Sequence, residues 1–165
     1  DGVIGPYFFD FYNGTGWMGV VETSANGFFW QGSCAPSVGA NLTQVVCVIP
    51  EDGLLDMYRI AYGAKAWPSV SSSLGQGDRA SITSDGGQNL VVSAFNHSTD
   101  MVYYVRSTDG GSTWTPPVTV SATESGDPFV DYPGLDASSG FSPSGGFTMG
   151  WTTGTNAYLV RVFEV

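Results

Sequence analysis

The chain has 165 residues and a net charge of −10, with 42% apolar and only 12% charged residues. This balance excludes intrinsic disorder, which requires high charge and few apolar side chains. The five Lys and Arg residues are spread along the chain and cannot form the basic face that nucleic acid or an anionic membrane surface requires. No apolar run approaches the roughly 20 residues that span a bilayer, so membrane insertion is not expected.

Short runs with strand composition, bounded by Gly, Pro, Asn and Asp, predict an all-β fold, and no stretch keeps helical spacing for three turns. The clearest hairpin pairs residues 91–95 with 101–105 across a polar turn. The same plan recurs at 17–30, 45–60 and 147–163, which indicates a repeat of about 40 residues. We therefore expect one domain built as a β-propeller-like array of about four small antiparallel blades. A β-sandwich with irregular hairpins is the alternative. The expected repeats span residues 1–38, 39–77, 78–125 and 126–165.

Other segments have the composition of additional blade strands. Residues 78–82 and 131–135 precede the third and fourth hairpins and are expected to be inner strands. A Trp followed by Pro-x-Val predicts outer strands at 36–38, 68–70 and 116–118. The last repeat then lacks its outer strand, which residues 1–4 could supply to close a ring. Otherwise the chain is part of a larger propeller, or open strand edges pair between copies and give a homo-oligomer or fibre.

Cys34 and Cys47 lack the CxxC spacing of metal or redox sites, and we expect a disulfide between them, with two buried thiols as the alternative. Three Asn-x-Ser/Thr sequons, at Asn13, Asn41 and Asn96, are candidate glycosylation sites. Few lysines, two cysteines and these sequons together predict an extracellular or cell-surface glycoprotein.

Residues 107–114 match the pattern S-x-D-x-G-x-T-W at every fixed position. We expect Asp109 to close the turn by accepting hydrogen bonds from backbone N–H groups. The two glycines permit positive φ angles, and the Trp ring is expected to pack under the hairpin. The structural residues of this motif are Ser107, Asp109, Gly111, Thr113 and Trp114.

This segment resembles the Asp box (BNR repeat) of sialidases and related β-propellers. Residues 78–151 resemble two successive blades of that superfamily, whereas the first 70 residues resemble it only loosely. Residues 24–30 look like a shortened copy of the box. The resemblance implies that the box lies on the outer rim, where it supports the blade and is not catalytic. It therefore indicates a fold more than a function.

Sialidase-like catalysis requires a three-Arg cluster for the substrate carboxylate, a Tyr nucleophile with a Glu partner, and an acidic proton donor. Residues 58–61 resemble the family's Arg-Ile-Pro element, but Ala61 replaces the Pro. Arg106 adjoins the box and is expected at the rim, so only Arg79 and Arg59 are expected to face a central channel. A catalytic site is therefore not indicated.

Other chemistries have little support. His97, the only histidine, lies in a predicted turn and is expected to be solvated. No His/Cys cluster has zinc spacing. Asp127, Asp131 and Asp136 lie in a Gly-rich loop where Ca²⁺ could bind, although the EF-hand spacing is missing; no other cofactor is indicated. Residues 51–56 are acidic and are expected to form a solvated turn.

Aromatic residues are dense near the N-terminus, in residues 7–17, where they form either a packed core strand or an exposed aromatic face. Aromatic faces stack on sugars and anchor protein interfaces. The leading hypothesis is a non-catalytic extracellular module that binds a glycan or a protein, with self-assembly as one form of binding. The alternatives are a fragment of a sialidase-like glycoside hydrolase and a structural subunit of a surface fibre. The candidate ligand-binding residues are Arg79, Arg59, Tyr7, Tyr12 and Trp17.

Overall fold

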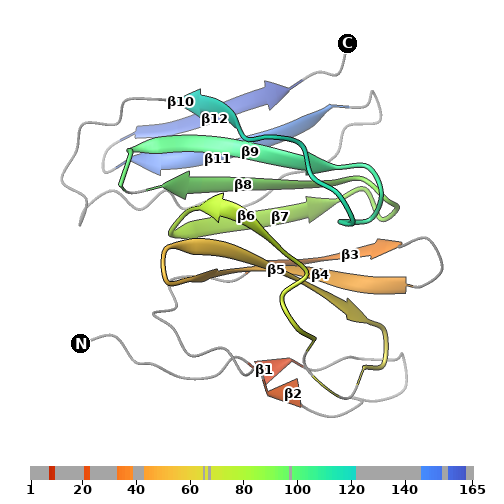
Figure 1. Cartoon of the computed structure of the whole chain (residues 1–165). Coiled ribbons are helices and arrows are strands. Elements are labelled where there is room, and N and C mark those ends of the chain that lie inside the picture. The colour runs from red at the N-terminus through yellow and green to blue at the C-terminus, as the bar shows by residue number, and fades with distance from the viewer. Residues whose placement is uncertain are drawn as a thin grey trace.

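A computed structural model of the chain is shown in Figure 1. The structure describes residues 8–9, 21–22, 33–38, 43–64, 66, 68–96, 98–121, 146–153 and 156–162. Every regular element in these ranges is a β-strand, which confirms the predicted all-β class. No helix in this part of the chain has the length and hydropathy needed to cross a bilayer.

The first large sheet is an antiparallel meander in the order β3-β4-β5-β6. Its strands are β3 (Ser33–Val38), β4 (Thr43–Glu51), β5 (Leu54–Ala61) and β6 (Ser72–Gln76). Asp52 and Gly53 form the β4–β5 turn with φ angles of 49° and 78°, the conformation of a tight type I′ hairpin turn. The predicted hairpin over 45–60 is confirmed. β3, which lies before the expected repeat boundary at residue 38, belongs to the same sheet because it pairs with β4.

The expected outer strand at 68–70 is wrong, because β6 begins only at Ser72. Pro68 has no N–H to give to a neighbouring strand. Pairing with β5 starts where the Ser71 N–H donates to the Met57 carbonyl at 2.8 Å. The strand therefore lies a few residues later than its composition indicates.

The second large sheet is an antiparallel meander in the order β10-β9-β8-β7. Its strands are β7 (Arg79–Ser84), β8 (Leu90–Asn96), β9 (Met101–Ser107) and β10 (Val118–Ser121). The clearest predicted hairpin is thus confirmed, with Phe95 opposite Val102. β10 begins directly after Pro116 and Pro117, which cannot donate to a sheet ladder.

Two further strand pairs are described. β11 (Phe147–Thr153) and β12 (Asn156–Val162) form the predicted fourth hairpin. β1 (Phe8–Phe9) pairs with β2 (Val21–Glu22), while most of the predicted first hairpin lies outside the described residues. The strand expected at 131–135 and the segment 1–4 also lie outside them.

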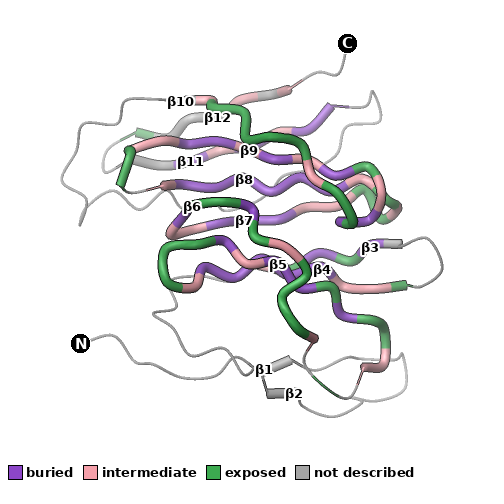
Figure 2. Tube along the Cα trace, in the orientation of Figure 1, coloured by how far each residue is buried: buried purple, intermediate pink, exposed green. Residues whose placement is uncertain are grey.

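The two large sheets pack face to face around one apolar cluster. The first sheet contributes Val46, Val48, Leu55 and Met57, and the second contributes Ile82, Leu90, Val92 and Val105. Two hydrogen bonds also join β3 to the second sheet: the Ile82 N–H donates to Ser33 Oγ at 3.2 Å, and Ser37 Oγ donates to the Gly87 carbonyl at 3.2 Å. The core therefore lies between the sheets, as the buried segments in Figure 2 show.

The opposite face of the second sheet is also covered, because successive residues of a strand point to opposite faces. Val91, Phe95 and Val102 pack there against β11 and its three buried side chains, Phe147, Met149 and Trp151. β8 is consequently buried along almost its whole length. These stacked antiparallel sheets do not form a closed barrel within the described residues, and they fit both the blade-like array and the sandwich alternative.

Cys34 of β3 and Cys47 of β4 lie opposite one another and form a disulfide, as predicted. Cys47 is fully buried with Ile49, Tyr58 and Ile60 on the face of the first sheet that points away from the central core. The disulfide therefore cross-links the edge strand β3 to its only hydrogen-bonded neighbour within the described sheet.

Candidate functional site

The box loop, residues 107–114, connects β9 to β10 and is closed by Asp109. Its Oδ1 accepts hydrogen bonds from the Ser107 hydroxyl at 2.8 Å and from the N–H groups of Ser112 and Thr113, both at 2.9 Å. Its Oδ2 accepts from the Thr113 hydroxyl at 2.6 Å. Ser107 Oγ in turn accepts from the Gly111 N–H at 2.8 Å. The pattern residues thus form one connected network around a single carboxylate.

The box loop also fastens the two sheets together. Gln44 of β4 donates from Nε2 to the Gly110 carbonyl at 2.6 Å. Arg59 of β5 donates from Nη1 to the Ser112 hydroxyl at 2.8 Å. Gly111 has a φ of 82°, and a Cβ placed there would lie 3.3 Å from Leu90 of the second sheet. Glycine therefore provides both the backbone conformation and the close approach.

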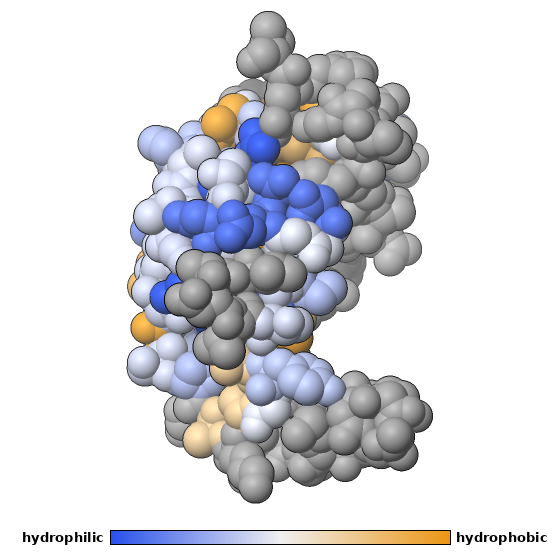
Figure 3. All heavy atoms as spheres, turned by 90° about the vertical axis from the view of Figure 1, so that its right-hand side faces the viewer, coloured by the Kyte–Doolittle hydropathy of each residue, from blue (hydrophilic) through white to orange (hydrophobic). Residues whose placement is uncertain are grey.

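The end of the molecule that carries the box loop is strongly polar. The box loop lies beside the β7–β8 turn, since the Gly110 N–H donates to the Gln88 carbonyl at 2.9 Å. Asp85 closes that turn by accepting from the Gly87 N–H at 2.7 Å and from Asn89 Nδ2 at 2.6 Å. Figure 3 shows hydrophilic side chains gathered on this end. The loops here are held by their own carboxylates.

Burial alone would raise the pKa of Asp109, but the hydrogen bonds from Thr113, Ser107 and Ser112 outweigh it and lower the pKa to about 2. A carboxyl with a depressed folded-state pKa stabilises the fold above its unfolded pKa of about 3.9. That contribution disappears as the pH falls through the folded pKa. The box should therefore be an acid-sensitive element.

We predict that the stability difference between the wild type and Asp109→Asn is largest near neutral pH and shrinks between about pH 4 and about pH 2. The amide of Asn does not titrate over this range, so this position adds no pH-dependent term to the free energy of unfolding of the variant. Urea unfolding of both proteins at several pH values measures the difference, and other carboxyl groups cancel because both proteins contain them. A difference that stays constant down to pH 2 would contradict the prediction.

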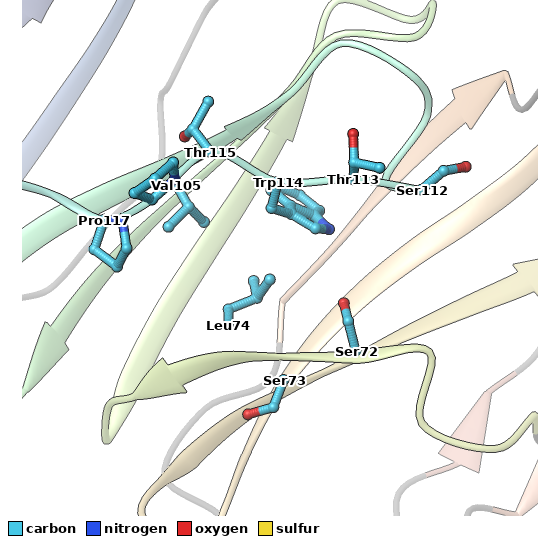
Figure 4. Close-up of a pocket in the computed structure, with 10 residues that line it drawn as sticks. Ser72, Ser73, Leu74, Val105, Ser112, Thr113, Trp114, Thr115 and Pro117 are labelled. Atoms are coloured by element: carbon cyan, nitrogen blue, oxygen red, sulfur yellow. The ribbon is translucent and has the colours of Figure 1, made fainter.

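A pocket with a volume of about 420 Å³ lies between the C-terminal part of the box loop and the edge strand β6; we call it the Trp114 pocket. Its size is within the range of small-molecule sites. Trp114 is half-buried and packs against the central core, while Leu74 and Val105 are apolar lining residues. Figure 4 shows the labelled side chains from both sheets around this space. The hydroxyl-bearing residues of the lining are Ser72, Ser73, Ser112, Thr113 and Thr115.

Two buried polar atoms of the Trp114 pocket have no hydrogen-bond partner among the described residues: Trp114 Nε1 and Ser72 Oγ. In Figure 4 these two groups point toward one another across the pocket. A buried polar group without a partner costs about 1–3 kcal/mol. A ligand hydroxyl that reached both groups could accept from the indole N–H and donate to the Ser72 hydroxyl, and would remove this cost.

The structure does not bring the two candidate arginines together. Arg59 lies at the box end, where it contacts Ser112. Arg79 is paired with Phe95 at one end of the β7–β8 ladder, and Ser84 is paired with Leu90 at its other end, beside the box loop. Arg79 therefore lies at the end of the second sheet that is far from the box loop. The other candidate ligand-binding residues, Tyr7, Tyr12 and Trp17, lie outside the described residues.

A Tyr–Glu pair does occur, because the Tyr58 hydroxyl donates to Glu51 Oε1 at 2.8 Å. Tyr58 is only 3% exposed, so its oxygen is poorly placed to reach a substrate. Adjacent strand residues point to opposite faces, so Arg59 projects away from this pair. Burial raises the pKa of Glu51, and this outweighs the hydrogen bond from Tyr58. The pair fits a structural role better than nucleophilic chemistry.

Of the acidic segment 51–56, expected to be a solvated turn, only Asp52 and Gly53 form the β4–β5 turn, whereas Glu51 ends β4 and Asp56 lies in β5, and both are partly buried. Burial is also the largest cause that raises the pKa of Asp56, and the charge of Asp52 adds to it. Among the described residues, no three His, Cys, Asp or Glu side chains lie close enough together to hold a metal ion. The calcium candidates Asp127, Asp131 and Asp136 and the histidine His97 lie outside the described residues.

One of the three sequons is described. Asn96 ends β8, and its Oδ1 accepts hydrogen bonds from the Ser98 N–H at 3.0 Å and the Ser98 hydroxyl at 2.6 Å. The acceptor residue is therefore the last residue of β8, directly before the β8–β9 turn, and a site next to a turn is the kind of position that glycosylation requires. Asn13 and Asn41 lie outside the described residues.

Comparison with models of known families, with curated proteins and with solved structures found no match to this chain.

The sequence pattern identified Trp114 but not the pocket beside it. Ser72 lies in a Ser- and Gly-containing segment with no strand signal, and it meets Trp114 only through the packing of two sheets. Buried hydroxyl and indole groups without partners are visible only in the structure. No local sequence signal could have indicated this site.

Proposed function

We propose that the protein is a non-catalytic binding module for an uncharged glycan, which binds in the Trp114 pocket. The observation that carries the proposal is the pair of partnerless groups, Trp114 Nε1 and Ser72 Oγ, that face one another across a hydroxyl-lined pocket. Sugar hydroxyls both donate and accept hydrogen bonds, so one of them can satisfy both groups at once.

The absence of charge favours an uncharged ligand. None of the described residues that line the Trp114 pocket is acidic or basic. An anionic ligand would lose its hydration there without a cationic residue in the lining, since Arg59 bonds to Ser112 but does not itself line the pocket, and such a loss is costly. A protein partner is the alternative, but the small volume and the hydroxyl-rich lining suit a sugar better than a flat protein surface.

The proposal extends to family and location. A relationship to the Asp-box propellers is supported by the network around Asp109 and by two successive four-stranded antiparallel sheets. An extracellular or cell-surface location is supported by the Cys34–Cys47 disulfide, since disulfides persist in oxidising compartments. Glycan binding at a cell surface is consistent with both.

The test uses Ser72→Ala, because Ser72 Oγ has no hydrogen-bond partner among the residues that the structure describes. Removing it should leave the melting temperature unchanged or slightly higher, since a partnerless buried group is lost. The same change should weaken glycan binding about fivefold, the value of one hydrogen bond. Ser69→Ala is the matched control, because Ser69 is exposed and lies outside the pocket lining.

Binding is measured by titration calorimetry with a panel of neutral sugars: glucose, galactose, mannose and N-acetylglucosamine. Lactose and sialyllactose form a paired comparison in which the sialyl group should bring no gain. The proposal is wrong if no neutral sugar binds, or if Ser72→Ala and Ser69→Ala bind equally well. Release of sialic acid from sialyllactose would instead support the glycoside hydrolase alternative.

A further inference from the structure

A second, smaller pocket adjoins the Trp114 pocket. Its volume is about 210 Å³, and we call it the Met101 pocket. Leu74 and Pro117 line both pockets, so the two spaces meet along these side chains. At this volume the Met101 pocket is below the usual range for an independent ligand site, which begins at about 300 Å³. It is better suited to hold one substituent of a ligand bound next door.

The side chains of the Met101 pocket are mainly apolar. Leu74, Met101, Pro117 and the ring of Tyr103 supply its lining. The Tyr103 hydroxyl already donates to the Gln76 carbonyl at 2.7 Å. Burial raises the pKa of Tyr103 to about 12, with the charge of Asp78 as a smaller cause, so the phenol stays neutral at physiological pH.

Two polar residues at the rim of the Met101 pocket, Asn96 and Thr99, are engaged in hydrogen bonds of their own. Asn96 Oδ1 accepts two hydrogen bonds from Ser98, and the Thr99 hydroxyl donates to the Asn96 carbonyl at 3.5 Å. None of the described lining residues carries a charge. The Met101 pocket therefore differs from the Trp114 pocket, in which Trp114 Nε1 and Ser72 Oγ lack hydrogen-bond partners among the described residues.

From this contrast we infer that the glycan carries an apolar substituent, which occupies the Met101 pocket while the sugar ring occupies the Trp114 pocket. The inference rests on the proposed glycan binding and specifies its ligand class: an uncharged sugar that carries an apolar group next to the ring. The shared residues Leu74 and Pro117 lie between the two parts. An alkyl aglycone or the methyl of an acetamido group would supply this chemistry.

The experiment compares methyl and octyl β-glucosides, methyl and octyl β-galactosides, and methyl N-acetyl-β-glucosaminide, all at concentrations below micelle formation. The wild type should bind at least one substituted sugar about tenfold more tightly than its methyl glucoside or galactoside counterpart, because burial of apolar surface is favourable. A gain for the octyl glycosides identifies an aglycone, and a gain confined to the N-acetyl sugar identifies an acetamido group.

Met101→Gln places a polar side chain of similar length in the pocket, and Met101 is partly exposed, so the fold should tolerate it. This variant should lose most of the tenfold gain while binding the plain methyl glycosides as the wild type does. Val70→Gln is the matched control, since Val70 is 45% exposed and lines neither pocket; it should keep the full gain. Melting curves check that both variants are folded.

Two failures can be told apart. If methyl glycosides bind but no substituent increases affinity, or if Met101→Gln keeps the gain, the inference about the Met101 pocket is overturned and glycan binding stands. If none of the sugars binds, glycan binding itself is overturned, and this inference with it.

Discussion

Asp109→Ala should lower the free energy of unfolding by about 3 kcal/mol, because hydrogen bonds to a charged group contribute about 1.5–3 kcal/mol each and the exposed ones contribute less. The carboxylate accepts bonds from Ser107, Ser112 and Thr113. Without it, two backbone N–H groups lose their partner and the loop that contacts Gln44 and Arg59 loosens. Urea denaturation followed by tryptophan fluorescence measures the change.

The matched control is Thr108→Ala, in the same loop. Thr108 is exposed, so its loss should change the free energy of unfolding by less than about 0.5 kcal/mol. Equal effects from the two variants would mean that the Asp109 network does not hold the loop.

The second large effect is expected from the disulfide. The free energy of unfolding of the variant Cys34→Ala/Cys47→Ala should be about 3 kcal/mol lower than that of the wild type. The disulfide joins residues with a sequence separation of 13, and closing a loop of this length lowers the conformational entropy of the unfolded chain. Reduction of the wild type should produce a loss of similar size. Urea denaturation with and without reductant measures both.

The double variant is its own control for the reductant. Reductant should leave the unfolding midpoint of Cys34→Ala/Cys47→Ala unchanged, since it has no disulfide to break. If the wild type is equally stable in both conditions, the cross-link does not stabilise the β3–β4 pair.

Local signals made part of this fold predictable from the sequence. The β8–β9 hairpin follows from two apolar runs around a polar turn that contains Asn96. The box loop is recognised from eight consecutive residues, and the hydrogen bonds that close it around Asp109 lie within them. Cys34 and Cys47 are the only two cysteines, so their pairing required no choice between partners.

What the sequence did not predict depends on contacts between distant segments. β6 contains Gly75 and two serines, which are poor strand residues, and it pairs with β5 through an irregular register. Its position is decided by the neighbouring strand and by Leu74, which is buried in the central core. The Trp114 pocket is formed by β6 and the box loop together, so it could not be predicted without knowing how the two sheets pack.

The second sheet has apolar side chains buried on both faces, against the first sheet and against β11. An arrangement of this kind is close to one-dimensional, since each layer is stabilised mainly by the layers directly next to it. The stability of one sheet then depends mainly on whether the sheets packed directly against it are folded, and less on sheets that it does not contact. The box loop forms hydrogen bonds with residues of both large sheets, so it couples the folding of one sheet to the folding of the other.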